Sequence, residues 1–108
     1  MTRWNLTRHA KASLIEIYEH TRANWGTRQA DAYLDKIYDR FKKIADKTVV
    51  WRAIPKEFEV DGHFTRCEQH YIYWRQAPNK EIIITDILHV SMMQGERLNK
   101  AFGSHEDK

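Results

Sequence analysis

The chain has 108 residues and a mass of 13.0 kDa, with 42% apolar residues, 31% charged residues and a mean hydropathy of −0.75. This length predicts a single domain, residues 1–108, that buries roughly two thirds of the surface of its unfolded chain. Four Trp, five Tyr and four Phe exclude an intrinsically disordered chain, and no apolar run approaches the roughly 20 residues of a membrane span.

The single cysteine, Cys67, excludes an intramolecular disulfide framework and is typical of a reducing compartment. Residues Met1–Leu6 lack the hydrophobic stretch of a signal peptide, so we expect a soluble cytoplasmic protein. Residues 1–48 carry ten Lys/Arg against six Asp/Glu, whereas residues 49–108 carry eight against nine. A basic half can meet nucleic acid or an acidic partner, or it can simply be a solvated helical face.

The first half of the chain predicts a short strand followed by a helical hairpin. Residues 2–7 alternate between apolar and polar side chains, as a strand does. Apolar residues then recur with a helical period over residues 8–24 and again from Thr27 to about Lys47. Gly26 is suited to end the first helix and Thr27 to cap the second. Two helices joined by so short a connection lie nearly antiparallel, so their apolar stripes form one seam.

The second predicted helix also carries a row of basic residues. The row consists of Lys36, Arg40, Lys43 and Lys47. As a nucleic-acid site it is a weak signal, because an ordinary solvated helix face has the same composition. We expect it to lie on the far side of the hairpin from the sheet.

The second half of the chain predicts a connecting segment and three strands. Residues 48–62 have no clean period but are too apolar for a disordered linker, so we expect them to pack along the fold. Residues 64–68, 71–77 and 81–90 return to a strand period. Together with the hairpin these strands indicate an α+β fold that ends in a short C-terminal helix or tail.

The last predicted strand is apolar on both faces. Strict alternation places Ile82, Ile84 and Leu88 on one face and Ile83 and Ile87 on the other. One helical hairpin covers only one face of a small sheet. The second face needs another cover, which is the connecting segment, the C-terminal tail or a partner protein, and we favour a partner protein.

Candidate metal ligands are few. The one cysteine–histidine cluster consists of His63, Cys67 and His70. In a strand His63 and Cys67 share a face while His70 points away, which is poor geometry for zinc. We therefore expect no metal and no cofactor, and we interpret Cys67 as a buried structural thiol.

A metal-free ribonuclease needs a base for the 2′-hydroxyl, an acid for the leaving oxygen and cations for the phosphorane charge. The candidates for these roles are Arg66, Arg75, Lys80, His70 and His89. Arg66 lies in the middle of a strand, where a charge must reach solvent or a partner. For every candidate the alternative is an ordinary surface or edge-strand charge.

Five segments, taken in order, resemble the ParE-type toxins of the RelE/ParE superfamily. They are Ala10–Tyr18, Trp25–Tyr33, the stretch with Pro55, Gly62 and Arg66, Tyr71–Arg75, and Ile87–Met92. The resemblance spans about residues 4–95. It implies a helical hairpin on a small, mostly antiparallel sheet of three to four strands. It also implies a toxin of a type II toxin–antitoxin system that binds and inhibits DNA gyrase, without being an enzyme, and that a cognate ParD-like antitoxin neutralises.

The sequence departs from the ParE pattern at three places. Asp86 stands where many ParE chains have an arginine, Ser13 replaces an aspartate, and Trp51 stands where a glycine is common. These departures bear on target contact more than on the fold.

The RelE branch of the superfamily, which cuts mRNA on the ribosome, fits less well. No tyrosine follows Tyr73, and no arginine occurs between Arg75 and Arg97, so most of the ribonuclease cluster is missing. The alternative function is nevertheless a ribosome-dependent mRNA interferase that uses Arg66, Arg75, Lys80 and His89. A third alternative is an unrelated binding module that shares only the shape.

For a ParE-like toxin we expect the target or the antitoxin to contact the last strands and the tail. The contact residues predicted are Arg66, Tyr71, Tyr73, Trp74, His89, Met92, Met93, Leu98 and Phe102. We expect no direct sequence-specific nucleic-acid binding and no membrane contact.

Overall fold

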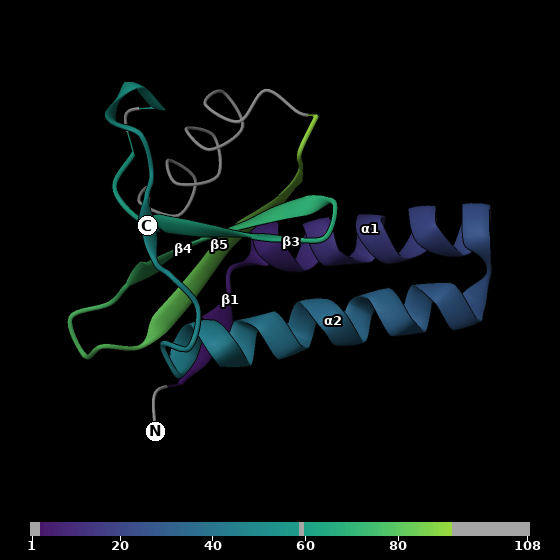
Figure 1. The fold of residues 1–108 in the computed structure, drawn as a ribbon, viewed down its shortest axis with the longest axis horizontal. Coiled ribbons are helices and arrows are strands. Elements are labelled where there is room, and N and C mark those ends of the chain that lie inside the picture. Colours follow the sequence, from purple (N-terminus) through teal and green to yellow (C-terminus); the bar gives the residue numbers. More distant parts are fainter. Residues whose placement is uncertain (1–2, 59, 92–108) are drawn as a thin grey trace.

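The computed structural model describes residues 3–58 and 60–91 of the chain (Figure 1). The elements in chain order are β1 (Trp4–Leu6), α1 (Arg8–Trp25), α2 (Thr27–Ala45), β2 (Arg52–Ala53), a 3-10 turn η1 (Lys56–Phe58), β3 (His63–Cys67), β4 (His70–Gln76) and β5 (Ile82–His89). The helical hairpin packs on the sheet at one end and projects beyond it at the other (Figure 1). None of the described helices is long and apolar enough to cross a membrane.

The strands lie in the order β1-β5-β4-β3-β2. β1 runs parallel to β5, with Trp4 opposite Ile82, and the other neighbouring pairs are antiparallel. The sheet has five strands in the described part of the chain, where three or four were predicted. The additional strand is β2, which lies within the predicted connecting segment and pairs Arg52 with Phe64.

The helix ends differ in how they are capped. The Thr7 side chain accepts a 3.0 Å hydrogen bond from the Ala10 amide and caps α1, as threonine commonly does. Gly26 ends α1 at φ 94°, a conformation that residues with a Cβ rarely adopt, and it is also the N-cap of α2. The predicted capping role of Thr27 is wrong, because Thr27 is already helical.

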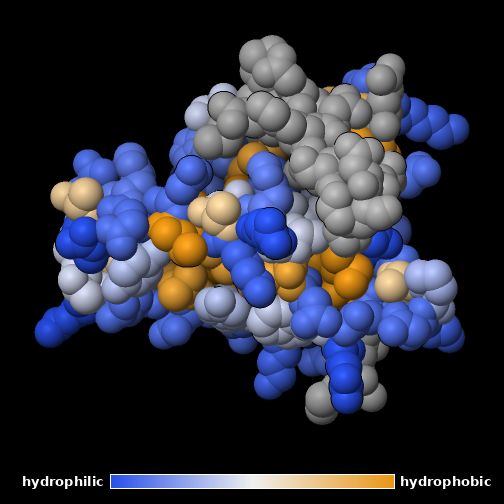
Figure 2. Space-filling model, turned by 180° about the vertical axis from the view of Figure 1, so that it is seen from behind, coloured by the Kyte–Doolittle hydropathy of each residue, from blue (hydrophilic) through white to orange (hydrophobic). Residues whose placement is uncertain are grey.

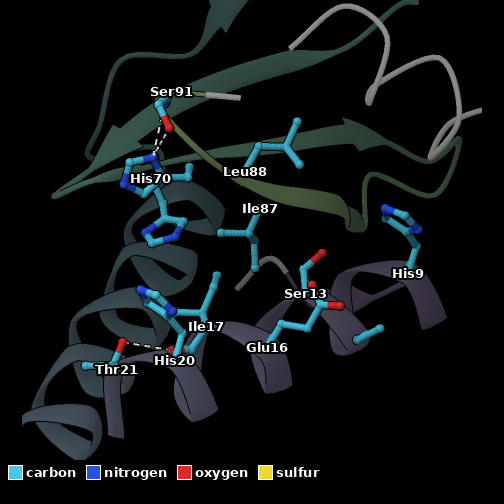
Figure 3. A pocket seen from close by; sticks show the side chains of 12 residues that line it. His9, Ser13, Glu16, Ile17, His20, Thr21, His70, Ile87, Leu88 and Ser91 are labelled. Carbon is cyan, nitrogen blue, oxygen red and sulfur yellow. Dashed lines mark hydrogen bonds between the residues drawn. The ribbon is translucent and has the colours of Figure 1, made fainter. Parts of the chain in front are cut away.

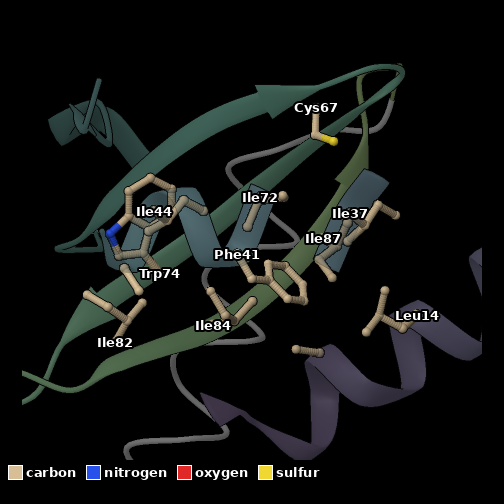
Figure 4. Close-up of a cluster of buried hydrophobic side chains, with 12 residues drawn as sticks. Leu14, Ile37, Phe41, Ile44, Cys67, Ile72, Trp74, Ile82, Ile84 and Ile87 are labelled. Carbon is tan, nitrogen blue, oxygen red and sulfur yellow. The ribbon is translucent and has the colours of Figure 1, made fainter. Parts of the chain in front are cut away.

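The main core lies between the helices and the sheet (Figure 4). Its buried members are Ala10, Leu14, Ile37, Phe41, Ile44, Ala45, Cys67, Ile72, Trp74, Ile82, Ile84 and Ile87. In Figure 4, Ile37, Phe41 and Ile44 of α2 lie among the side chains of the strands. The apolar stripe predicted for this helix is therefore confirmed as its buried face.

A β-bulge interrupts β5. Trp74 of β4 lies opposite Ile84, but its neighbour Tyr73 lies opposite Asp86. Thr85 is therefore an extra residue in β5, and its side chain donates a 3.2 Å hydrogen bond to the Tyr73 carbonyl. An extra residue shifts the phase of the in-and-out alternation for the rest of the strand.

This phase shift makes part of the predicted alternation wrong. Ile87 was assigned to the face opposite Ile82 and Ile84, but it belongs to the helix-side core together with them. Leu88 was assigned to their face and belongs instead to the cluster on the other side of the sheet.

The connecting segment covers this second face. Ile54 is buried there together with Tyr73 and Leu88. Partly buried side chains packed around these three are Phe58, Val60, Phe64 and Tyr71. The expectation that this segment packs along the fold is confirmed, and the preference for a partner protein as the cover is wrong for this part of the face. The predicted C-terminal helix or tail lies outside the described residues, with its contact residues Met92, Met93, Leu98 and Phe102.

Candidate functional site

The four residues of the interferase alternative lie at two ends of the sheet. Arg66 in β3 and His89 in β5 belong to the end where β3 turns into β4. Arg75 lies near the opposite end of β4, and Lys80 lies in the β4–β5 turn. Arg75 is four positions along the strand from Tyr71, the partner of Arg66, which corresponds to about 13 Å. In-line cleavage requires its acid, base and cations in one pocket, and these residues are not brought together in one.

Arg66 reaches solvent, as the sequence argument requires of a charge in a strand. Its side chain is exposed, and its Nε donates a 2.9 Å hydrogen bond to the carbonyl of Glu68. Its own carbonyl accepts a 3.1 Å hydrogen bond from Arg40 of α2.

The predicted contact residues of β4 differ in their exposure. Tyr71 is partly buried, whereas Tyr73 and Trp74 are only 2% and 0% exposed. Burial, reinforced by the neighbouring Tyr71 and Asp86, raises the pKa of the Tyr73 hydroxyl. Tyr73 and Trp74 therefore lie in the cores of the fold, and Arg66, Tyr71 and His89 are the predicted contact residues of the strands that retain exposed surface.

A cleft of about 580 Å³ opens between α1 and the ends of β4 and β5 (Figure 3). It is lined by His9, Ala12, Ser13, Glu16, Ile17, His20, Thr21, His70, Ile87, Leu88, His89 and Ser91. His70 and His20 face each other from the sheet and from α1 in Figure 3. From the sequence His70 and His89 were separate candidates; their common place in this histidine cleft depends on the tertiary structure.

His70 is held neutral in the histidine cleft. Its burial, together with the charges of His89 and His20, lowers its pKa to about 4. The Tyr33 hydroxyl lies 2.7 Å from Nδ1 of His70, where a neutral imidazole accepts a hydrogen bond. The same hydroxyl accepts a 3.1 Å hydrogen bond from the Gln69 amide. A neutral His70 thus links the β3–β4 turn to α2.

The cysteine–histidine cluster has a different geometry from the one predicted. Cys67 lies directly opposite His70 across β3 and β4, so both side chains share the helix-side face, and the prediction that His70 points away is wrong. Cys67 is 1% exposed, and burial raises the pKa of its thiol, which confirms the interpretation as a structural thiol. Over residues 3–58 and 60–91, no three His, Cys, Asp or Glu side chains are placed to hold a metal ion.

Asp86 forms a buried polar link between β5 and α1. Ser13 donates a 2.8 Å hydrogen bond to one carboxylate oxygen, and the Ile87 amide donates to the same oxygen at 2.8 Å. His9 Nε2 lies 3.1 Å from the other oxygen. Burial raises the pKa of Asp86, and these partners offset only part of that effect. A carboxylate in an apolar strand needs such partners, and this was the available signal for the link; from the sequence Asp86 was noted only as standing where many ParE chains have an arginine.

A second, shallower groove of about 480 Å³ lies between α1 and α2. It is lined by Leu6, Lys11, Leu14, Ile15, Tyr18, Glu19, Leu34 and Tyr38. Ile15 is 64% exposed and Tyr38 is 39% exposed. Figure 2 shows apolar side chains gathered near the middle of a largely hydrophilic face. The sequence signal for this hairpin groove was Ile15, an apolar residue beside the buried stripe, and it was missed.

The basic row of α2 does not lie on the far side of the hairpin from the sheet, so that prediction is wrong. Arg40 reaches the carbonyl of Arg66, and Cys67 Sγ lies 3.8 Å from the carbonyl of Lys36. The row therefore runs beside β3.

Residues 5–94 match the model of a family described as the ParE toxin of the type II toxin–antitoxin system, parDE. The chain belongs to this family. Toxin ParE of Escherichia coli is 28% identical over 92 residues, which are 85% of this chain and 88% of that protein. A solved structure titled "Chromosomal ParDE TA system from P. aeruginosa" shares the fold, with a TM-score of 0.68 and 24% identity over 84% of this chain and 98% of that chain. The resemblance to ParE-type toxins and the α+β fold are thereby confirmed.

Proposed function

We propose that this ParE-family toxin acts in the cytoplasm by binding DNA gyrase and inhibiting it, with no enzymatic step of its own, and that a cognate ParD-like antitoxin neutralises it. The observation that carries the proposal is the separation of Arg66 and His89 from Arg75 and Lys80 along the sheet. A binding toxin needs a complementary surface and no assembled acid–base pair. Membership of the ParE family supports the same choice.

The exposed residues at the β3–β4 end are the proposed part of the gyrase contact. Arg66 supplies an exposed guanidinium, and Tyr71 lies opposite it on the same face. His89 lies two strands away at the same end of the sheet. Arginine and tyrosine are the residue types that contribute most often to the energetic centre of a protein interface.

The hairpin groove is the proposed docking site for the antitoxin. Its lining is mostly apolar and includes the charged Lys11 and Glu19, which suits an amphipathic helix that lays its apolar face into a groove. Ile15, 64% exposed, is the side chain that gains most from being covered. A toxin that is stored bound to its antitoxin exposes such a side chain only when it is released.

The decisive experiment compares two activities of the purified toxin. One assay measures DNA supercoiling by gyrase, and the other measures codon-dependent mRNA cleavage in a translation extract. We expect loss of supercoiling or accumulation of cleaved DNA complexes, with mRNA intact. Cut mRNA with normal supercoiling would overturn the proposal in favour of the interferase, with Arg66 as the first residue to mutate.

The antitoxin site is tested with two matched substitutions. Ile15→Glu places a charge in the hairpin groove, and Val50→Glu makes a comparable change at a side chain that is 70% exposed elsewhere. We expect Ile15→Glu to weaken antitoxin binding about tenfold or more, which corresponds to about 1.4 kcal/mol, and Val50→Glu to leave it unchanged. Calorimetric titration with the purified antitoxin measures both. Equal effects of the two variants would remove the hairpin groove from the proposal.

A further inference from the structure

The basic row of α2 runs beside the outer edge of the sheet. Lys36, Arg40 and Lys43 follow one another at steps of four and three residues in α2, so they share one helix face about 10 Å long. Lys47 lies in the turn just beyond the end of this helix, with a φ of 59°. At one end of the row Arg40 donates to the carbonyl of Arg66 in β3. At the other end the Lys47 ammonium lies 4.7 Å from the centre of the Trp51 ring. The row thus runs antiparallel to β3 along its length.

Two arginines lie at the same edge of the sheet, on the face away from α2, because Arg52 pairs with Phe64 and Arg66 pairs with Tyr71. Arg66 is exposed in β3, and Arg52 is exposed in β2 at the very edge of the sheet. We call the set of Lys36, Arg40, Lys43, Lys47, Arg52 and Arg66 the basic edge. Three carboxylates adjoin it: Asp39 pairs with Lys43 at 3.2 Å, Asp46 directly precedes Lys47, and Glu68 follows β3. Cations outnumber carboxylates there, which creates a positive potential over the edge.

Edge protection alone does not account for this arrangement. Charged side chains on an edge strand deter pairing with other chains, and Arg52 and Arg66 suffice for that role. The basic row adds three cations on one face of α2, and Lys47 after the helix end, beside the strand. The row itself contains no apolar side chain that could anchor a protein partner, and lysine is depleted at the centre of protein interfaces.

We propose that the basic edge binds the phosphate backbone of duplex DNA, without reading its sequence. One strand of B-DNA presents a phosphate every 3.4 Å of helix axis, so the helical part of the row, about 10 Å long, faces roughly three phosphates. Long flexible lysine side chains suit contacts with phosphates, which position a protein on DNA but carry no base information. For its biological setting the inference rests on the proposed function: a toxin bound to gyrase would then also hold the DNA on which gyrase works.

The test measures binding of the purified toxin to a labelled 20-base-pair duplex by fluorescence anisotropy at 50 to 200 mM salt. The variant Lys36→Gln/Lys43→Gln/Lys47→Gln removes three charges of the row and leaves Arg40 on its carbonyl. The matched control Arg8→Gln/Lys42→Gln/Lys80→Gln removes three exposed charges away from the basic edge. Circular dichroism checks that both variants keep the fold.

We expect the row variant to bind DNA at least tenfold more weakly at 50 mM salt. Its slope of log affinity against log salt should flatten by about 3, because each phosphate contact contributes roughly 0.9 to the slope. The control variant should retain most of the DNA affinity and most of the salt slope. The proposal is overturned if the two variants lose affinity equally, since net charge alone then explains binding. It is also overturned if poly-glutamate or single-stranded RNA binds as tightly as the duplex.

A gyrase supercoiling assay on the same proteins separates this inference from the proposed function. If the wild type leaves supercoiling intact but the row variant alone loses DNA binding, the basic edge stands and the gyrase proposal fails. If the wild type inhibits gyrase and neither protein binds the duplex, the gyrase proposal stands and the DNA inference fails.

Discussion

The two helices of the hairpin have nearly the same length but are attached to the sheet in different ways. α2 buries five side chains, which are Ala30, Ile37, Phe41, Ile44 and Ala45. α1 buries only Ala10 and Leu14 and adds the polar link from Ser13 and His9 to Asp86. Apolar packing contributes most of the stability but sets direction weakly, whereas hydrogen bonds are directional. The comparison indicates that α2 stabilises the sheet while the polar link orients α1, along which the histidine cleft opens.

The largest effect should come from breaking the attachment of α2. Phe41 is 0% exposed and its ring lies 5.0 Å from that of Trp4. Phe41→Ala is expected to lower the free energy of unfolding by about 3–5 kcal/mol, because it removes buried apolar surface and leaves a cavity. Urea denaturation measures the loss.

Phe64→Ala provides the matched control on the other face of the sheet. Phe64 is only partly buried, so we expect a loss of about 1–2 kcal/mol. Equal losses for the two phenylalanines would contradict the view that the α2 face dominates stability.

Breaking the attachment of α1 should cost less. Asp86→Ala leaves the Ser13 hydroxyl and the Ile87 amide without their acceptor, for which we expect about 2–3 kcal/mol in the same urea experiment. Asp86→Asn keeps an oxygen acceptor, so its free energy of unfolding should fall by less. A loss for the asparagine variant as large as that for alanine would show that charge, and not the hydrogen bonds, holds α1.

The stability difference between the wild type and Asp86→Asn should also depend on pH. Burial holds the folded-state pKa of Asp86 above its unfolded value, so the folded state takes up a proton first as pH falls. The free energy of unfolding of the wild type, relative to that of Asp86→Asn, should therefore rise as pH falls through the folded-state pKa of Asp86. At pH values above that pKa, the buried carboxylate is charged and destabilises the wild type by its full amount.

His70 in the histidine cleft should give the stability a pH dependence opposite to that from Asp86. The folded-state pKa of His70 is about 4, below the value of about 6.5 in an unfolded chain, so the unfolded state takes up the proton first. Wild-type stability should fall by about 1–2 kcal/mol between pH 6.5 and pH 4, after allowance for solvent screening of the ring. Urea midpoints across this range measure the loss. The free energy of unfolding of His70→Gln should change less with pH over the same range, whereas that of His20→Gln should keep most of the pH dependence.

The smallest effect is expected at the contact between α2 and the β3–β4 turn. Tyr33→Phe removes the hydroxyl that lies against His70 Nδ1 and accepts from the Gln69 amide. We expect a loss of about 1 kcal/mol and a rise in the pKa of His70, because its neutral form loses a hydrogen-bond donor. An NMR titration of the His70 ring measures the pKa. An unchanged His70 pKa would mean that burial alone sets it.

The sequence predicted the elements well because their signals are local. The helical period over residues 8–24 lies within α1, Arg8–Trp25, and the β-branched run of residues 81–90 contains β5. The side-chain faces of β5 were less predictable, because the bulge at Thr85 depends on its pairing with Tyr73 and Trp74. Pairing between strands is a tertiary property that alternation along one strand cannot reveal.

The candidate sites depended still more on tertiary placement. Tyr73 and Trp74 have the composition of contact residues but lie in the two cores on either side of the sheet. The basic row was identified correctly as one helix face for Lys36, Arg40 and Lys43, whereas Lys47 lies beyond the end of α2. That the row neighbours β3 follows from how α2 crosses the sheet. The hairpin groove required the position of Ile15 relative to a second helix.

The parallel pairing of β1 with β5 joins the two ends of the described chain. The Thr7 hydroxyl donates to the carbonyl of Thr85, 78 positions later in the sequence, and β5 lies between β1 and β4 in the sheet. Such distant partners make chain closure late and entropically costly. During synthesis the hairpin is made first, and its apolar faces stay uncovered until the strands of the sheet have been made. A chain that terminates before β5 cannot form this sheet, so premature termination should give an unfolded product for proteases and not a partly active toxin.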